Sequence, residues 1–254
     1  PQYPQGVVDP VAEIAELAKR GPELGVNTSF NGADWPAIRD RVFGRIDPMA
    51  AGGEDYRKGL DNVTVFQHDA RFVGRKQLQV GAEVITADRV VLAAGARAFI
   101  PTIPGMEAAG FHTSDTIMRV DELPERLIVL GGGYIAAELG SVFGSLGSGV
   151  TYLLRSDVML RPQDGDISSR ITKIYGERFT THYNADIQRV RRDDDGDVVV
   201  ELGNGSEVRG DALLVASGRT PNGDQLGVAE TGVDLDDRGR RRHDRFDRRL
   251  RDVV

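Results

Sequence analysis

The sequence of 254 residues contains no cysteine, and this absence excludes several kinds of chemistry. Without a thiol, the chain has no disulfide, no thiolate nucleophile and no metal site with cysteine ligands. The few histidines do not replace such ligands, because their spacing is unlike that of a metal site. They are His68, His112, His182 and His243. We therefore expect no metal site.

Long hydrophobic runs are also missing. No segment reaches the roughly 18 apolar residues that a membrane-spanning helix needs. The first ten residues, PQYPQGVVDP, lack the basic and apolar regions of a signal peptide. We therefore expect a cytoplasmic protein that does not contact a membrane. Because the chain starts with Pro1 instead of methionine, we also expect a fragment or a processed start.

The net charge of −7 argues against general binding of nucleic acid, but this charge is unevenly distributed. Residues 238–251 hold eight arginines and two aspartates, a local charge of +6. A basic tail of this kind can bind nucleic acid or an acidic protein partner. It has almost no apolar residue and no periodicity, however, and this is more typical of a disordered or altered chain end.

Apolar residues make up 40% of the chain, which is enough for a core. Asp9 and Pro10 predict the start of a helix that Gly21 ends. A second helix is predicted from about Asp34, with Pro36 in its first turn. Short strands follow, and their alternating polarity predicts a small antiparallel meander with one solvent-facing side. The predicted strands cover residues 63–66, 77–80, 83–86 and, as an apolar run, 90–94.

The second half of the chain alternates apolar strands with helix and turn signals. Residues 127–130 have no polar member, as expected of a buried parallel strand, and residues 150–154 form a second apolar run. Asn204 and Gly205 predict a hairpin turn. A last buried strand is predicted at residues 212–216. This order of elements predicts an α/β fold.

Three small residues follow the first buried strand at the spacing of a dinucleotide-binding turn. Gly131 permits a tight turn, Gly133 lets the backbone approach a pyrophosphate, and Ala136 lets the next helix pack closely on the strand. The N–H groups at the start of that helix can then bind the anion. The alternative is an ordinary turn between a strand and a helix. Because strand, turn and helix fall in the expected order, we predict a nucleotide site.

Three motifs stand out among these elements: AAGARAFIP at 93–101, GGGYIAAE at 131–138 and ASGRTPN at 216–222. Together they resemble those of the pyridine-nucleotide flavoprotein disulfide reductases, the glutathione reductase family. Two further segments, RVFGRIDPMAAGGEDYR at 41–57 and FHTSDTIMRVDELPE at 111–125, resemble the mycothione reductases within that family.

The resemblance implies an α/β fold in which a Rossmann-like NAD(P)H domain is nested within a partial, three-layer FAD-binding domain with a small antiparallel meander. The implied domains are residues 1–115 for FAD, residues 116–235 for NAD(P)H, and a divergent Arg-rich tail at 236–254. The resemblance also implies FAD and NADPH as cofactors. For the complete enzyme it implies a mycothione-like small-molecule disulfide as substrate and a homodimer.

The sequence departs from the family at both ends. The Gly-rich loop for the FAD pyrophosphate, the redox cysteine pair, the Gly-Asp motif for FAD and the dimer domain with its catalytic His-Glu pair have no counterpart here. The family implies an oxidoreductase, but we expect this chain alone to be inactive. One alternative is a catalytically silent nucleotide-binding fragment with a basic partner-binding tail. Another is a relative of ferredoxin or nitrite-type reductases, which need no cysteine pair, and the segments at 41–57 and 111–125 argue against it.

The choice between NADPH and NADH depends on the end of the second buried strand. NAD sites place an acidic residue there for the ribose 2′-hydroxyl. Here the strand is followed by Arg155 and then Arg161, and guanidinium groups suit a 2′-phosphate. We therefore predict NADPH. Asp157 keeps NAD as an alternative, and the two arginines can also be ordinary surface charges.

The resemblance implies catalytic roles for two residues of the helix after the glycines. Tyr134 matches a tyrosine that lies over the flavin and moves aside for the nicotinamide, and its alternative role is helix packing. Glu138 lies four residues further along the same helix face. It matches a glutamate that pairs with a lysine beside the redox cysteines, and that lysine is missing here. Its alternative role is that of a solvated helix acid.

Further cofactor contacts are implied outside this helix. Gly218 permits a close turn, and Arg219 can reach the flavin or the nicotinamide unless it forms a salt bridge within its loop. Ala94 and Gly95 match the place beside FAD where the chain crosses between domains. The residues that match a hairpin whose backbone contacts the adenine are Asp69 and Ala70.

Overall fold

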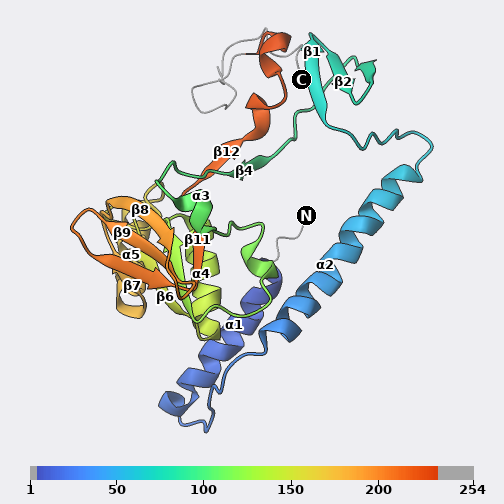
Figure 1. The fold of residues 1–254 in the computed structure, drawn as a ribbon. Helices are drawn as coiled ribbons and strands as arrows, with labels where there is room; N and C mark the ends of the chain where they lie inside the picture. The colour runs from blue at the N-terminus through green and yellow to red at the C-terminus, as the bar shows by residue number, and fades with distance from the viewer. Residues whose placement is uncertain (1–4, 234–254) are drawn as a thin grey trace. The chain divides into compact units, whose positions relative to one another are not determined.

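The computed structural model describes residues 5–233 (Figure 1). The chain divides into two compact units. Unit 1 takes in residues 1–52 and 100–218, and unit 2 takes in residues 53–99 and 219–254. Residues 1–52 thus belong to the same unit as the predicted nucleotide-binding segment. These units are defined by contacts within the chain, whereas the predicted domains at 1–115 and 116–235 are defined by the cofactor that each would bind, so the predicted domains stay a prediction. The predicted tail at 236–254 lies outside the described residues.

Unit 1 is built on a parallel sheet whose strand order is β11-β5-β6-β7. Its two central strands are the predicted apolar runs. In each parallel pair of strands, every residue of the shorter strand has a partner, and the register does not shift. The strands are β5 (Arg126–Leu130), β6 (Gly149–Leu153), β7 (Thr180–His182) and β11 (Ala212–Val215). The predicted strands at 127–130, 150–154 and 212–216 are therefore confirmed.

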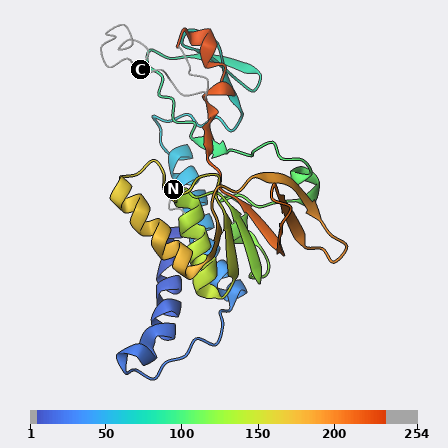
Figure 2. The same ribbon diagram turned by 90° about the vertical axis from the view of Figure 1, so that its left-hand side faces the viewer.

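Both faces of this sheet are covered, which explains why β11 is apolar throughout and β5 is apolar after Arg126. Leu127 and Val129 face a cluster formed with the helices, and Ile128 and Leu130 face a second cluster on the other side. Figure 2 shows the three layers of unit 1: helices, parallel sheet and antiparallel sheet. The helices of the first layer are α1 (Gln5–Arg20), α4 (Tyr134–Leu146) and α5 (Gly165–Arg178).

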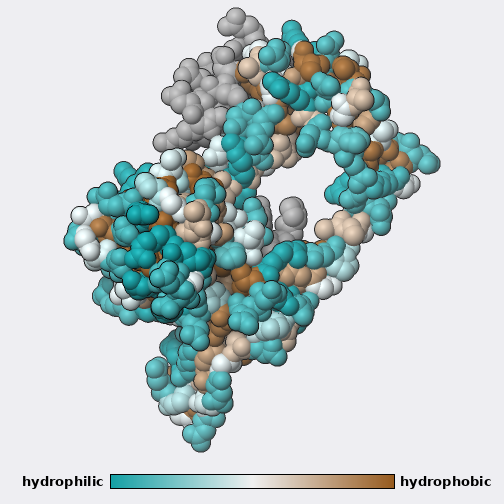
Figure 3. Space-filling model, viewed as in Figure 1, coloured by the Kyte–Doolittle hydropathy of each residue, from teal (hydrophilic) through white to brown (hydrophobic). Residues whose placement is uncertain are grey.

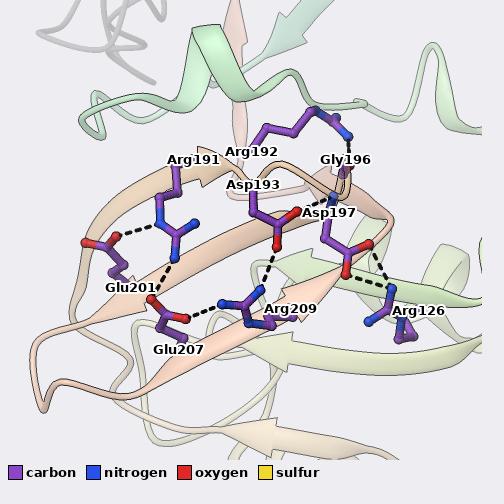
Figure 4. A network of polar contacts seen from close by, with 9 residues as sticks. All are labelled: Arg126, Arg191, Arg192, Asp193, Gly196, Asp197, Glu201, Glu207 and Arg209. Carbon is purple, nitrogen blue, oxygen red and sulfur yellow. Dashed lines mark hydrogen bonds and ion pairs between the residues drawn. The ribbon is translucent and has the colours of Figure 1, made fainter.

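The third layer is an antiparallel sheet of β8 (Ile187–Arg192), β9 (Val198–Leu202) and β10 (Glu207–Gly210), joined by the short helix α3 (Met106–Ala109). The β9–β10 hairpin confirms the turn predicted at Asn204 and Gly205. Its outer face is charged, and the corresponding surface is mostly hydrophilic in Figure 3. A ladder of arginines and carboxylates runs across it (Figure 4), with Arg191 bonded to both Glu201 and Glu207.

Two helix predictions differ in outcome. Helix α2 (Trp35–Lys58) begins after Asp34, whose side chain accepts a hydrogen bond from the Ala37 N–H at 3.0 Å, as predicted. Helix α1 ends at Arg20 before Gly21, also as predicted, but it begins at Gln5 and not at Asp9. Pro10 lies inside it. We attribute the longer helix to tertiary packing, because its buried residues Val8, Ala12 and Ala15 belong to the main core of unit 1.

Unit 2 contains the predicted meander, with antiparallel strand order β1-β2-β3. The strands are β1 (Ala70–Gly74), β2 (Gln77–Val80) and β3 (Glu83–Thr86). The prediction of strands at 63–66 and 90–94 is wrong, because neither run pairs with another strand in the described part of the chain. Without a partner strand both runs leave apolar side chains exposed, and Val91 is 78% exposed.

A second small sheet in unit 2 pairs β4 (Ala96–Ala98) with β12 (Arg219–Pro221). Short 3-10 turns complete the described elements: η1 (Gly21–Leu24), η2 (Ile117–Arg119), η3 (Asn222–Asp224) and η4 (Val228–Thr231). Among the described helices, none has the length and hydropathy required to span a bilayer.

Candidate nucleotide-binding site

The glycine turn after β5 has the geometry that each of its small residues predicts. Gly131 has a φ of 135°, a conformation that side-chain-bearing residues rarely adopt. A Cβ atom at Gly131 would clash with the carbonyl oxygen of Ala216, at the end of β11. The missing side chain therefore lets the carboxyl ends of β5 and β11 meet. In an open α/β sheet, ligands bind outside these strand ends.

Gly133 is the N-cap residue of α4, and no side chain caps the helix. Apart from the neighbouring residues in the chain, no described residue has an atom within 4 Å of the position that a Cβ at Gly133 would take. The first N–H groups of a helix have no partner within the helix, and they carry the positive end of its dipole. Open space in front of uncapped N–H groups fits the pyrophosphate of a dinucleotide.

The rest of α4 is packed tightly on the sheet. Ala136 is fully buried, and a Cβ atom at Gly140 would clash with the hydroxyl group of Tyr152 on β6. That hydroxyl donates to the Ala136 carbonyl at 3.2 Å, and the hydroxyl of Tyr175 on α5 donates to the Ala137 carbonyl at 3.0 Å. Small residues and two buried tyrosines thus fix the first turns of the helix against the strands.

The loop after β6 carries the two predicted phosphate ligands. Arg155 and Arg161 are both exposed, and neither side chain forms a hydrogen bond or ion pair with any other residue that the structure describes. The loop between them contacts the glycine turn directly, because the Leu160 N–H donates to the Gly132 carbonyl at 2.7 Å. The structure therefore places two unpaired cations on a loop that is bonded to the glycine turn.

The two predicted catalytic residues lie on the surface of α4. Tyr134 is the first residue of the helix and is 58% exposed, so helix packing does not hold its ring. Glu138 is one turn further along. Partial burial raises the pKa of the Glu138 carboxyl group, and the negative charge of Asp9 on α1 raises it further. Glu138 thus has a carboxylate as its charged neighbour in the described structure, in place of a cation.

The remaining predicted cofactor residues lie in or next to unit 2. Asn222 binds the backbone at the predicted crossing point, since its side chain donates to the Ala94 carbonyl at 2.9 Å and its N–H donates to the Gly95 carbonyl at 3.1 Å. Arg219 donates to the carbonyl of Ala96. Asn222 is a residue that the sequence analysis missed, although it ends the ASGRTPN motif.

The other three of these residues occupy backbone positions. Gly218 has a φ of 145° and ends the unit 1 segment of the chain. Ala70 pairs with Val80 in the meander, and Asp69 directly precedes it. No α-helix begins within the described residues of unit 2. These residues alone therefore do not fit a complete flavin dinucleotide, because they offer no helix N-terminus for its pyrophosphate.

The family model of the pyridine nucleotide-disulphide oxidoreductases matches residues 11–251 of this chain. Mycothione reductase from Mycobacterium tuberculosis is 38% identical over 234 residues, which is 89% of this chain and 50% of that protein. Mercuric reductase from Bacillus cereus is 34% identical over 233 residues, covering 89% of this chain and 36% of that protein. The chain thus spans half or less of the length of these relatives.

A solved structure agrees with these matches. The HOCl-induced flavoprotein disulfide reductase RclA from Escherichia coli superposes with a TM-score of 0.80 at 25% identity. The superposition covers 96% of this chain and 52% of that one. The predicted fold class and the predicted family are therefore confirmed, and the family implies a flavin and a pyridine nucleotide. The chain belongs to the pyridine nucleotide-disulphide oxidoreductase family.

Proposed function

We propose that the complete protein is an NADPH-dependent flavoprotein disulfide reductase of the mycothione reductase type, and that this chain supplies its nicotinamide-nucleotide site. The single observation that carries the proposal is the arrangement around Gly132. On one side lies the uncapped N-terminus of α4, with open space at Gly133. On the other side lies a bonded loop with Arg155 and Arg161, two cations that have no partner among the described residues.

Each part of this site has a distinct role in the proposal. The N–H groups at the start of α4 bind the pyrophosphate, and the two guanidinium groups bind the 2′-phosphate of the adenosine. Tyr134, exposed at the helix start, would cover the nicotinamide pocket until the nucleotide enters. When bound, the two cofactors would supply hydride chemistry, and the residues of this chain would bind and orient the nicotinamide nucleotide.

The wider assignments are part of the same proposal. Ala94, Gly95, Arg219, Gly218, Asp69 and Ala70 would form part of the flavin wall. The complete enzyme would be a cytoplasmic homodimer that reduces a mycothione-like disulfide, in line with the 38% identity to mycothione reductase. This chain by itself has no cysteine to carry electrons to a disulfide. Glu138 would serve the complete enzyme next to the missing cysteine pair.

Calorimetric titration of the 254-residue chain with NADPH and with NADH tests the proposal. Tighter binding of NADPH is expected. Arg155→Ala and Arg161→Ala should each cost about 1.5–3 kcal/mol of NADPH binding, the usual contribution of a hydrogen bond to a charged group. Arg45→Ala, which removes an exposed arginine of α2, is the matched control and should change neither affinity. Equal affinities for both nucleotides, or a chain that binds neither, would overturn the proposal.

A further inference from the structure

Helix α5 binds the loop that carries Arg155 and Arg161, and it does so through one loop residue, Met159. The N–H of Met159 donates to the hydroxyl oxygen of Thr172 at 2.9 Å, and the carbonyl of Met159 accepts from the hydroxyl of Ser168 at 2.5 Å. Both backbone groups of Met159 are thus satisfied by side chains of α5. Its own side chain is fully buried in the core of unit 1.

The two hydroxyl groups have little freedom of their own. Thr172 uses its proton to donate to the Ser168 carbonyl at 2.7 Å, so its oxygen is left to accept from Met159. Ser168 is only 5% exposed, so its hydroxyl group is largely shielded from water that could replace its hydrogen bond. Residues four positions apart lie on one face of a helix. Ser168 and Thr172 therefore form a rigid pair of hydrogen-bonding groups. Thr172 holds the N–H of Met159, and Ser168 holds its carbonyl group.

The loop needs such support, because its backbone is strained. Leu160 has a φ of 51°, in the left-handed region that residues other than glycine rarely adopt because of steric strain. Its N–H is bonded to Gly132 on the glycine turn, one residue beyond the contacts with α5. The loop is thus fixed on two sides around its strained residue, by α5 at Met159 and by the glycine turn at Leu160.

We infer that Ser168 and Thr172 are positioning residues that set the specificity of the nucleotide site for a 2′-phosphorylated adenosine. The inference rests on the proposed NADPH site. Arg155 and Arg161 make no ion pair with described residues that would hold their side chains, so the backbone of the loop determines where their guanidinium groups start. If the loop is less rigid, the two guanidinium groups bind the 2′-phosphate less tightly. The pyrophosphate contacts at α4 stay intact, because they belong to another element.

The test measures how strongly the 254-residue chain prefers NADPH to NADH when either hydroxyl is removed. Ser168→Ala and the isosteric Thr172→Val should each reduce the ratio of the two affinities about threefold to tenfold, the value of one hydrogen bond. The affinity for NADH should stay within about twofold of the original. Thr172→Ser keeps the hydroxyl group and should restore the preference.

Ser148→Ala is the matched control. It removes another buried hydroxyl of unit 1, which donates to the Pro124 carbonyl at 2.6 Å, and should leave the affinity ratio unchanged. A second check combines Ser168→Ala with Arg155→Ala and Arg161→Ala. If Ser168 acts through the arginines, its effect on the ratio disappears in that background.

The outcomes separate this inference from the proposed function. An original chain without a preference for NADPH overturns both. An original chain that prefers NADPH, with Ser168→Ala and Thr172→Val variants that fold and keep the full preference, overturns only the positioning role. Variants that lose NADH and NADPH affinity equally also overturn it, since a general structural role predicts that result. A selective loss for NADPH, rescued by Thr172→Ser, supports it.

Discussion

Arg119 forms a two-point ion pair with Asp47, with nitrogen–oxygen distances of 2.8 and 3.2 Å, although 72 positions separate the two residues. The guanidinium group also lies over the ring of Phe43, 3.7 Å from its centroid. These residues belong to the two segments, 41–57 and 111–125, that resemble the mycothione reductases. The two segments that resemble the mycothione reductases are therefore in contact with each other. This contact fixes the chain after α3 on helix α2.

The Arg119–Asp47 pair predicts a pH-dependent contribution to stability. The hydrogen bond from Arg119 lowers the pKa of the Asp47 carboxyl group, so the folded state favours the ionised form. The resulting stabilisation is complete above the ordinary pKa of aspartate and is lost as the pH falls through the lowered pKa of the folded state. Asp47→Asn should therefore lower Tm slightly at pH 7, and less so as the pH falls below about 3.

Thermal unfolding at several pH values checks this prediction. Because the pair is half exposed, added salt should reduce the difference between the two proteins. Asp61→Asn, at an exposed position, is the control and should show neither dependence. A Tm difference that is the same at pH 7 and at low pH would contradict the assignment.

Trp35 fixes the start of α2 to the same segment. Trp35 is 1% exposed, its indole N–H donates to the Val120 carbonyl at 2.8 Å, and its ring contacts Phe143 on α4 at a centroid distance of 5.1 Å. Trp35→Phe should lower the free energy of unfolding by about 1–2 kcal/mol, because it removes one hydrogen bond and leaves a void. Denaturant unfolding measures this. The control Tyr56→Phe, at a position that is 70% exposed, should cost less than about 0.5 kcal/mol.

Two helical glycines should respond to alanine with opposite signs. A Cβ atom at Gly140 would clash with the buried Tyr152 hydroxyl, so Gly140→Ala should destabilise the protein by about 1–3 kcal/mol. Apart from the backbone of α2 itself and the chain neighbours, no described residue has an atom within 4 Å of the same position at Gly44. Gly44→Ala should therefore stabilise the protein by about 0.5–1 kcal/mol through helix propensity. Unfolding in urea compares the two variants. A stabilised Gly140→Ala variant would show that α4 does not pack on β6 as described.

Glu138 predicts the pH dependence opposite to that of Asp47. Partial burial and then the charge of Asp9 raise the pKa of its carboxyl group. An acid with a raised pKa in the folded state opposes folding once it ionises, so its cost appears above its ordinary pKa and is complete above the raised one. Glu138→Gln should therefore raise Tm at pH 7 and have little effect below about pH 4.

A double variant tests whether Asp9 is the neighbour responsible. Asp9→Asn should also raise Tm at pH 7, and the gain in the double variant should be less than the sum of the two single gains. Strictly additive gains would mean that the two carboxylates do not interact.

The sequence predicted those parts of the structure that local patterns determine. The apolar runs at 127–130 and 212–216 are buried strands, and the glycine spacing at 131–136 marks the turn and the start of α4. The apolar run at 90–94 misled the prediction, because a strand needs a partner that local sequence does not reveal. Whether residues 90–94 form a strand depends on tertiary contacts and not on their own sequence.

The same distinction applies within the candidate site. Arg155 and Arg161 could be selected from the sequence, because their charge and their distance from the glycines are visible there. Ser168 and Thr172 could not be selected. Serine and threonine in a helix are common, and their contacts with Met159 exist only because α5 packs behind the loop. Asn222 was overlooked because its contacts are to backbone carbonyls, which leave no sequence signal.

The isolated 254-residue chain lacks two features that flavin-dependent disulfide reduction requires. The described part of unit 2 offers no α-helix N-terminus for the pyrophosphate of a flavin, and the whole sequence offers no cysteine. The 254-residue chain should therefore purify colourless and stay so after incubation with FAD and desalting. It should also fail to oxidise NADPH with mycothione as acceptor, because electrons have no thiol route to a disulfide. Visible absorbance and the loss of NADPH absorbance measure these two properties.

The control is the complete protein, expressed from the flanking coding sequence, which should be yellow and active. A stoichiometric flavin on the present chain would show that its FAD site is complete, and turnover of mycothione would refute the cysteine-dependent mechanism.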